Sequence, residues 1–231
     1  MIHLADSKFK ITIGGDNILR RGVTATEREE ILVVIDVLRA SSTIVTALAN
    51  GAKEVIAVNT EEMAFGLRKK GYILAGEHNG VKLHDFDLGN SPVELLRYME
   101  QSDIEKIALK TTNSTKILTE VKNALICSSL NLTAIKHRLE DTGKSANFLV
   151  VGSTHGITED IAVAMALYSS LNDGLEINKA YLMECIIRCN TAKYLIGIGY
   201  KKDVEFVSQI DKYDVAPILN GGVICIPAFK Y

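Results

Sequence analysis

The sequence predicts an α/β fold, a mostly parallel or mixed sheet covered by helices on both faces in three αβα layers. One local plan occurs three times: a β-branched apolar strand, a polar turn and an apolar-periodic helix, at 31–51, 107–121 and 148–171. Shorter strands are expected at 54–58 and 72–76, with a helix at 61–71 that ends in glycine. Strands that alternate with helices favour a parallel, helix-covered sheet.

The chain has 231 residues, enough for one sizeable core. We expect a single α/β unit over residues 1–231. The alternative is a division of this unit into two similar lobes that meet near residues 100–150 and hold the site between them. The apolar segment 215–229 would suit either packing between such lobes or the contact of a homodimer.

The composition indicates a globular protein and a small-molecule partner. Hydrophobic residues make up 47% of the chain and only three prolines occur, which excludes a disordered or linker-rich protein. The net charge of -2, with both signs interspersed, offers no basic patch for nucleic acid or membrane, so a small-molecule partner is expected. The amino terminus lacks a secretory signal pattern and no apolar run approaches a membrane span, which predicts a cytoplasmic protein.

The four cysteines form no CxxC pair. Their spacing favours buried thiols over a zinc site or a disulfide framework, the residues being Cys127, Cys185, Cys189 and Cys225.

Polar residues gather in the three turns that follow the repeated strands. Hydroxyl groups and free backbone N–H groups at a helix start favour anions, and the ends of neighbouring parallel strands meet at one edge, so a shared anion pocket is expected. Ordinary helix N-capping is the alternative for any single turn. The turns supply Asp36, Arg39, Ser41, Ser42 and Thr43; Lys110, Thr111, Thr112, Asn113, Ser114 and Thr115; and Ser153, Thr154, His155, Glu159 and Asp160.

The segment 76–95 is unusually rich in acids, amides and imidazoles. Ser91-Pro92-Val93-Glu94 fits a capping box at the start of a helix. Carboxylate and amide oxygens suit magnesium, and Glu77, Asp87 and Asn90 could supply them together with Asp36. A solvated acidic loop is the alternative, and His78 and His84 fit surface positions.

Several of these stretches, taken in order, resemble the 2-phosphosulfolactate phosphatase family. They are DVLRASSTIVTALANGAKEVIAV from residue 36, DFDLGNSPVEL from residue 85, TTNST from residue 111, the Glu159-Asp160 pair, and a closing pattern at Asp211 and Pro217. The resemblance implies magnesium-dependent hydrolysis of the phosphate ester of 2-phospho-3-sulfolactate, a step of coenzyme M biosynthesis.

The resulting site prediction assigns three groups of residues. The metal ligands are Asp36, Glu77 and Asp87, with Mg2+ as the cofactor; the catalytic residues are Asp36, Glu159 and Asp160; the substrate-binding residues are Arg39, Ser41, His78, Asn90, Lys110, Thr111, Thr112 and Asn113. Asp160 or Glu159 would orient water or protonate the leaving alkoxide. Direct attack by water and a phosphorylated carboxylate both stay open.

The chain departs from the family pattern at several positions. His78 replaces an arginine, Lys110 opens a turn that is usually TTTNGT, Ser114 replaces the turn glycine, and Gly152-Ser153 stands where the family has AG before the third helix. They leave open an alternative, a non-catalytic or retuned paralogue that binds a small phosphorylated or sulfonated anion. A haloacid-dehalogenase-like phosphatase would need a second aspartate two residues after Asp36, where Leu38 stands.

Overall fold

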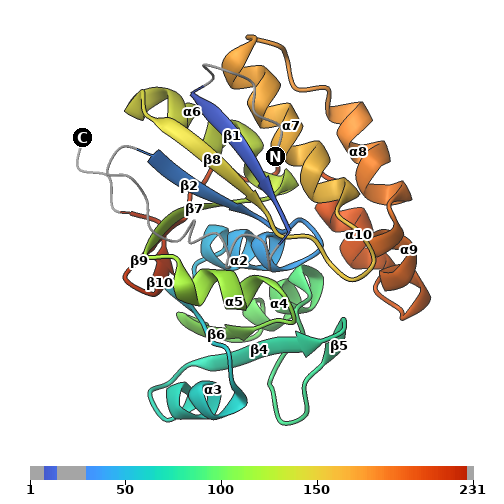
Figure 1. Ribbon diagram of the computed structural model, residues 1–231. Helices are drawn as coiled ribbons and strands as arrows, with labels where there is room; N and C mark the ends of the chain where they lie inside the picture. The colour runs from blue at the N-terminus through green and yellow to red at the C-terminus, as the bar shows by residue number, and fades with distance from the viewer. Residues whose placement is uncertain (1–7, 15–29, 228–231) are drawn as a thin grey trace.

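The computed structural model describes residues 8–14 and 30–227 (Figure 1). Residues 1–7, which carry part of the predicted non-secretory amino terminus, and residues 228–231, which end the apolar carboxyl-terminal segment, lie outside the described residues. The strands form one ten-stranded sheet in the order β1-β8-β2-β7-β9-β10-β3-β6-β4-β5. The sheet is mixed, as the fold prediction allowed.

Four parallel strands form the first block of the sheet. They are β1 (Phe9–Ile13), β8 (Ser145–Val150), β2 (Glu30–Ile35) and β7 (Asn123–Cys127). The side chains from Leu32 to Ile35 are almost fully buried on both faces of the sheet, which explains why β2 has a continuous apolar run rather than an alternating one.

The second parallel block contains β3 (Glu54–Ala57), β6 (Lys106–Lys110) and β4 (Ile73–His78), and β5 (Val81–Lys82) pairs antiparallel with β4 at the edge. An antiparallel hairpin of β9 (Ile218–Asn220) and β10 (Val223–Cys225) lies between β7 and β3. The apolar carboxyl-terminal segment therefore joins the two blocks of strands. The division into two lobes and the homodimer stay predictions.

Helices cover both faces of the sheet and confirm the three-layer fold class. Among the described residues of the first half of the chain these are α2 (Ala40–Ala49), α3 (Glu61–Arg68), α4 (Pro92–Met99) and α5 (Ser114–Glu120). A 3-10 turn, η1 (Ser129–Asn131), leads into α6 (Leu132–Thr142), and α7 (Thr158–Asn172) packs on β1, β8 and β2. Figure 1 shows a further group beside α7, formed by α8 (Lys179–Arg188), α9 (Asn190–Gly197) and α10 (Lys201–Val207).

The start of α4 follows the predicted capping pattern with one difference. The Ser91 side chain accepts a hydrogen bond from the Glu94 N–H, and Pro92 occupies the first helical position. The Glu94 carboxylate accepts instead from the Gly89 N–H, at 2.9 Å, so it fastens the preceding loop rather than Ser91.

Two sequence expectations concern properties of the whole chain. Within residues 8–14 and 30–227, no helix has the length and apolarity needed to cross a membrane. All four cysteines are free thiols. Cys127 and Cys189 are buried as predicted, whereas Cys185 and Cys225 are partly exposed.

Candidate active site

A cleft that is open to solvent receives the carboxyl ends of strands from both blocks. Residues after β2 and β8 line it from the first block, and residues of β4 and those after β6 line it from the second. Arg39 and Asn113 both line this cleft, as the single-pocket prediction requires. The lining includes Asp36, Arg39, Glu77, Asn79, Gly80, Asn90, Thr111, Thr112, Asn113, Ser153, His155, Glu159, Asp160, Thr191 and Tyr194.

Asp36 directly follows β2 and is buried at the floor of the cleft. One carboxylate oxygen accepts a hydrogen bond from the Ala40 N–H at 3.2 Å, and the other accepts from the Ser114 hydroxyl at 2.5 Å. Burial raises the pKa of Asp36 to about 6, and the charges of Glu77 and Glu159 add to the rise. The carboxylate is thus held in place, but its charge is costly.

The first turn of α7 supplies two more buried acids, Glu159 and Asp160. Asp160 accepts hydrogen bonds from the N–H groups of Val37 at 2.7 Å and Gly152 at 2.9 Å. Burial, with the nearby charges of Asp36 and Glu159, raises the pKa of Asp160 well above its usual value. Oε2 of Glu159 is buried without a hydrogen-bond partner among the described residues.

Glu77 approaches the cleft from β4 and has different surroundings. Its carboxylate accepts three hydrogen bonds, from the Gly80 N–H at 2.5 Å, the Thr112 N–H at 2.7 Å and the Thr112 hydroxyl at 3.0 Å. These contacts tie the β4–β5 turn to the turn after β6. Glu77 therefore organises the second side of the cleft.

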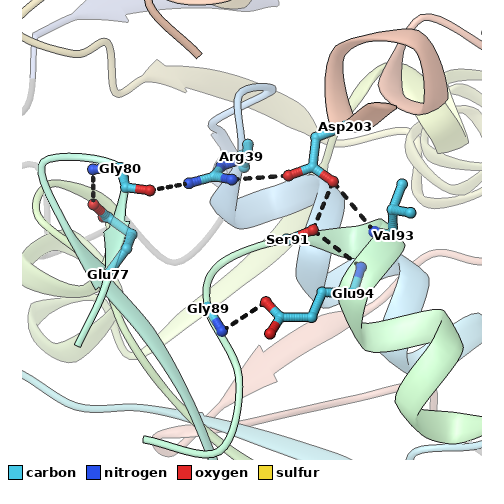
Figure 2. Close-up of polar contacts among 8 residues, drawn as sticks. All are labelled: Arg39, Glu77, Gly80, Gly89, Ser91, Val93, Glu94 and Asp203. Carbon is cyan, nitrogen blue, oxygen red and sulfur yellow. Dashed lines mark hydrogen bonds and ion pairs between the residues drawn. The ribbon is translucent and has the colours of Figure 1, made fainter. Parts of the chain in front are cut away.

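Arg39 is the guanidinium of the cleft, and Figure 2 shows how it is fixed. In that view it donates to Asp203 at 2.8 Å and to the Gly80 carbonyl at 2.8 Å. Its guanidinium carbon also lies 4.1 Å from the centre of the Tyr200 ring. Asp203 also accepts from the Ser91 hydroxyl at 2.6 Å. Asp203, on α10, was missed from the sequence because no local pattern relates it to Arg39.

The turn after β6 contains Thr111, Thr112 and Asn113 at the cleft. Thr111 and Thr115 exchange side-chain to backbone hydrogen bonds, which fix the turn. Asn113 precedes the first residue of α5, and its amide makes no capping bond. Ser114, at the position where the family usually has glycine, begins the helix without a positive φ, and its hydroxyl reaches Asp36.

The loop 76–91 places its two predicted oxygen ligands of the metal in different surroundings. Asn90 lines the cleft, and its Oδ1 is buried with no hydrogen-bond partner among the residues described. Asp87 does not line it: its carboxylate accepts from the Leu74 N–H at 2.8 Å and from Arg68 at 3.1 Å, and so holds the loop against β4. The expectation that Asp87 joins Asp36 and Glu77 around a metal is therefore corrected.

Three predicted substrate-binding residues also lie outside the cleft lining. His78 follows Glu77 in β4 and points to the opposite face, as the period of a strand requires, and it is exposed. Lys110, the last residue of β6, does not line the cleft, whereas Thr111 after it does. Ser41 is buried, and its hydroxyl accepts from the Asp36 N–H at 3.1 Å, so it supports the turn instead of a ligand.

The charge of the cleft bears on whether a magnesium ion fits. Among the described lining residues, four carboxylates face one guanidinium. In the described part of the chain no three His, Cys, Asp or Glu side chains are grouped as a ready metal cage. Magnesium commonly uses only one or two carboxylates together with water and substrate phosphate. The unpartnered oxygens of Glu159 and Asn90, beside Asp36, fit that type of ligand set.

Comparison with known proteins points to one family. The family model described as 2-phosphosulpholactate phosphatase matches residues 19–222. A Thermotoga petrophila protein named "Probable 2-phosphosulfolactate phosphatase" is 39% identical over 85% of this chain and 92% of its own length. Similarly named proteins of Thermotoga maritima and Caldanaerobacter subterraneus are 37% and 34% identical, each over 85% of this chain and over 92% and 90% of their own lengths. This chain belongs to the 2-phosphosulfolactate phosphatase family.

Proposed function

We propose that this protein is a magnesium-dependent phosphoric monoester hydrolase that converts 2-phospho-3-sulfolactate to 3-sulfolactate and phosphate. Family membership supports the reaction and the substrate. The observation that carries the proposal is the convergence of four carboxylates and Arg39 beside a hydroxyl-rich turn in one cleft. Phosphoryl transfer depends mainly on positioning and charge stabilisation, and this arrangement can supply both.

The phosphate group would lie against the turn 111–113 and Arg39. A guanidinium has five N–H donors, and Arg39 uses two of them toward Asp203 and the Gly80 carbonyl. The side chain is 2% exposed, so a phosphate oxygen would meet the guanidinium only where it lines the cleft, while Asp203 holds the group in place. Asn113, whose amide makes no capping bond, adds a neutral donor.

Asp36, Glu159 and Asn90 would hold the magnesium ion, with Glu77 beside them. Bound there, the ion would offset negative charge on the phosphate oxygens. A bound cation would offset the charge of the buried carboxylates and of an anionic substrate, since Arg39 already pairs with Asp203.

The two acids of α7 are suited to different roles. Oε2 of Glu159, which is buried without a hydrogen-bond partner among the described residues, is the oxygen that would face the magnesium ion. Asp160 has a raised pKa and so can keep a proton to give to the leaving oxygen as the phosphorus–oxygen ester bond breaks. The products are then the free hydroxy acid and inorganic phosphate.

Phosphate release from 2-phospho-3-sulfolactate, measured with magnesium and with a chelator, tests the proposal. We expect turnover only with magnesium, loss of turnover in Glu159→Gln, and normal turnover in Asp87→Asn, since Asp87 lies outside the cleft. Magnesium should also raise the melting temperature of wild type and Asp87→Asn, but less that of Glu159→Gln. Tight substrate binding without phosphate release would instead favour the non-catalytic paralogue.

A further inference from the structure

His155 occupies the cleft in a position that none of the roles above uses. It belongs to the loop between β8 and α7, and its ring stacks on that of Tyr194 from α9, with centroids 3.7 Å apart and planes inclined by 18°. Both residues line the cleft. The stack fixes the plane of the imidazole at the side formed by the first block of strands.

The loop that carries His155 is itself firmly held. Ser153 and Gly156 exchange backbone hydrogen bonds of 2.8 and 3.2 Å, and the Ser153 hydroxyl accepts from the His155 N–H at 3.1 Å. The same hydroxyl lies 3.2 Å from that of Thr191, at the start of α9. The hydroxyl of Tyr194 donates to the Asn79 carbonyl at 2.8 Å, so the stacking partner is anchored across the cleft.

The ring nitrogens of His155 have no hydrogen-bond partner among the described residues, although the ring position is fixed. A fixed donor without a protein partner is suited to bind a ligand. Among the described residues that line the cleft, Arg39 is the only guanidinium or ammonium group, and the proposed function uses it for the phosphate. His155 is thus the available group for a second anion.

We propose that His155 binds the second acidic group, carboxylate or sulfonate, of a phosphorylated hydroxy acid, and thereby selects such substrates over simple phosphate monoesters. This inference rests on the proposed phosphatase function and adds a specificity residue to it. The imidazole donates a hydrogen bond to the acidic group, while the phosphate lies at the turn 111–113. His78 and Lys110, which the sequence suggested for this task, do not line the cleft.

The decisive variant is His155→Phe, which keeps an aromatic ring to stack on Tyr194 but removes the ring nitrogens. Its matched control is His78→Phe, the same change at an exposed histidine outside the cleft. Three substrates separate the anions: p-nitrophenyl phosphate has neither acidic group, 2-phospholactate adds a carboxylate, and 2-phospho-3-sulfolactate adds a sulfonate as well. The measurements are kcat and KM for each pair of enzyme and substrate.

We expect His155→Phe to lower kcat/KM roughly ten- to a hundredfold, mainly through KM, for the substrate whose acidic group His155 binds. A loss already present with 2-phospholactate assigns the carboxylate, and a loss confined to 2-phospho-3-sulfolactate assigns the sulfonate. Turnover of p-nitrophenyl phosphate should change less than twofold, and His155→Gln, which restores a donor, should recover part of the loss. Equal losses on all three substrates, or none, would overturn the inference.

A direct binding measurement separates this inference from the reaction itself. Calorimetric titration with 3-sulfolactate needs no turnover, so it applies even if wild type releases no phosphate and the proposed function fails. Weaker binding to His155→Phe than to wild type and His78→Phe supports the subsite. Equal binding by all three proteins contradicts it, whatever the enzyme assay shows.

Discussion

The first block of strands forms one side of the cleft and the second block forms the other, and the two sides hold their carboxylates in opposite ways. On the first side, Asp36, Glu159 and Asp160 are crowded together and buried, and the pKa values of Asp36 and Asp160 are raised by burial and mutual repulsion. On the second side, Glu77 is also buried but accepts three hydrogen bonds from Gly80 and Thr112. The first side contains charge that the protein compensates poorly, whereas the second side contains charge that it uses as a structural anchor.

This difference indicates what each side is for. Poorly compensated carboxylates destabilise a protein unless a ligand offsets them, so they mark the side where a cation and the reacting groups belong. A carboxylate saturated by donors has little left to offer a ligand and chiefly positions its neighbours. The contrast predicts that neutralising an acid will have opposite effects on stability at the two sides.

The largest effect is expected from Asp36→Asn. The folded-state pKa of about 6 lies above the reference value of 3.8, and this difference corresponds to roughly 3 kcal/mol of destabilisation when Asp36 is ionised. The variant should therefore raise the free energy of unfolding of the metal-free protein by up to about 3 kcal/mol at pH 7.5, while phosphatase activity falls at least roughly a hundredfold. Urea denaturation with a chelator present measures the first quantity.

The free energy of unfolding of wild type and of Asp36→Asn, measured as a function of pH, tests whether burial of the Asp36 charge causes the difference. Because the folded state keeps the proton of Asp36 more tightly than the unfolded state, this group's contribution to stability is complete below about pH 4 and is lost as pH rises through about 6. The advantage of Asp36→Asn should thus vanish near pH 4 and be full above about pH 7. A constant difference across this range would mean that charge burial is not its origin.

The opposite and somewhat smaller effect is expected from Glu77→Gln. The carboxylate of Glu77 accepts hydrogen bonds from the N–H groups of Gly80 and Thr112. The amide of glutamine would turn its own N–H group toward one of these donors, and that hydrogen bond would be lost. The free energy of unfolding should fall by about 1–3 kcal/mol, the usual result of leaving buried polar groups unsatisfied. The exposed Glu176→Gln serves as the control and should change little. Stabilisation by Glu77→Gln would abolish the contrast between the two sides.

Some of this arrangement could be predicted from the sequence, and the part that could not has a physical reason. The strand-to-helix units carry strong local periodicity, so the α/β class and the polar strand ends at Asp36 and Thr111 were recognisable. The loop 76–91 has no periodicity, and its residues divide according to contacts with Leu74 and Arg68 that lie elsewhere in the chain. Nothing local therefore separated Asn90 from Asp87.

Alternation along strands offered a signal that the site prediction did not use. Glu77 and His78 are neighbours in β4, and neighbours in a strand point to opposite faces. Once Glu77 is placed in the cleft, His78 is excluded from it. Asp203 and Tyr194 could not be found in this way, because their roles arise only when α9 and α10 pack against the cleft.

The smallest expected effect concerns Ser114, whose hydroxyl crosses from the second side of the cleft to the first. Its hydrogen bond to Asp36 lowers the pKa of that carboxyl and so opposes the effect of burial. Ser114→Ala should raise the pKa of Asp36 further, and the rise of activity with pH should move upward by roughly 0.5–1 pH unit, the equivalent of one hydrogen bond. The pH profile of kcat/KM measures the shift. Ser42→Ala is the matched control, since the Ser42 hydroxyl is equally buried but bonds the Val37 carbonyl and leaves the Asp36 carboxylate untouched. An unchanged profile in Ser114→Ala would show that ionisation of Asp36 does not limit the reaction, and the first side of the cleft would then act through Glu159 and Asp160.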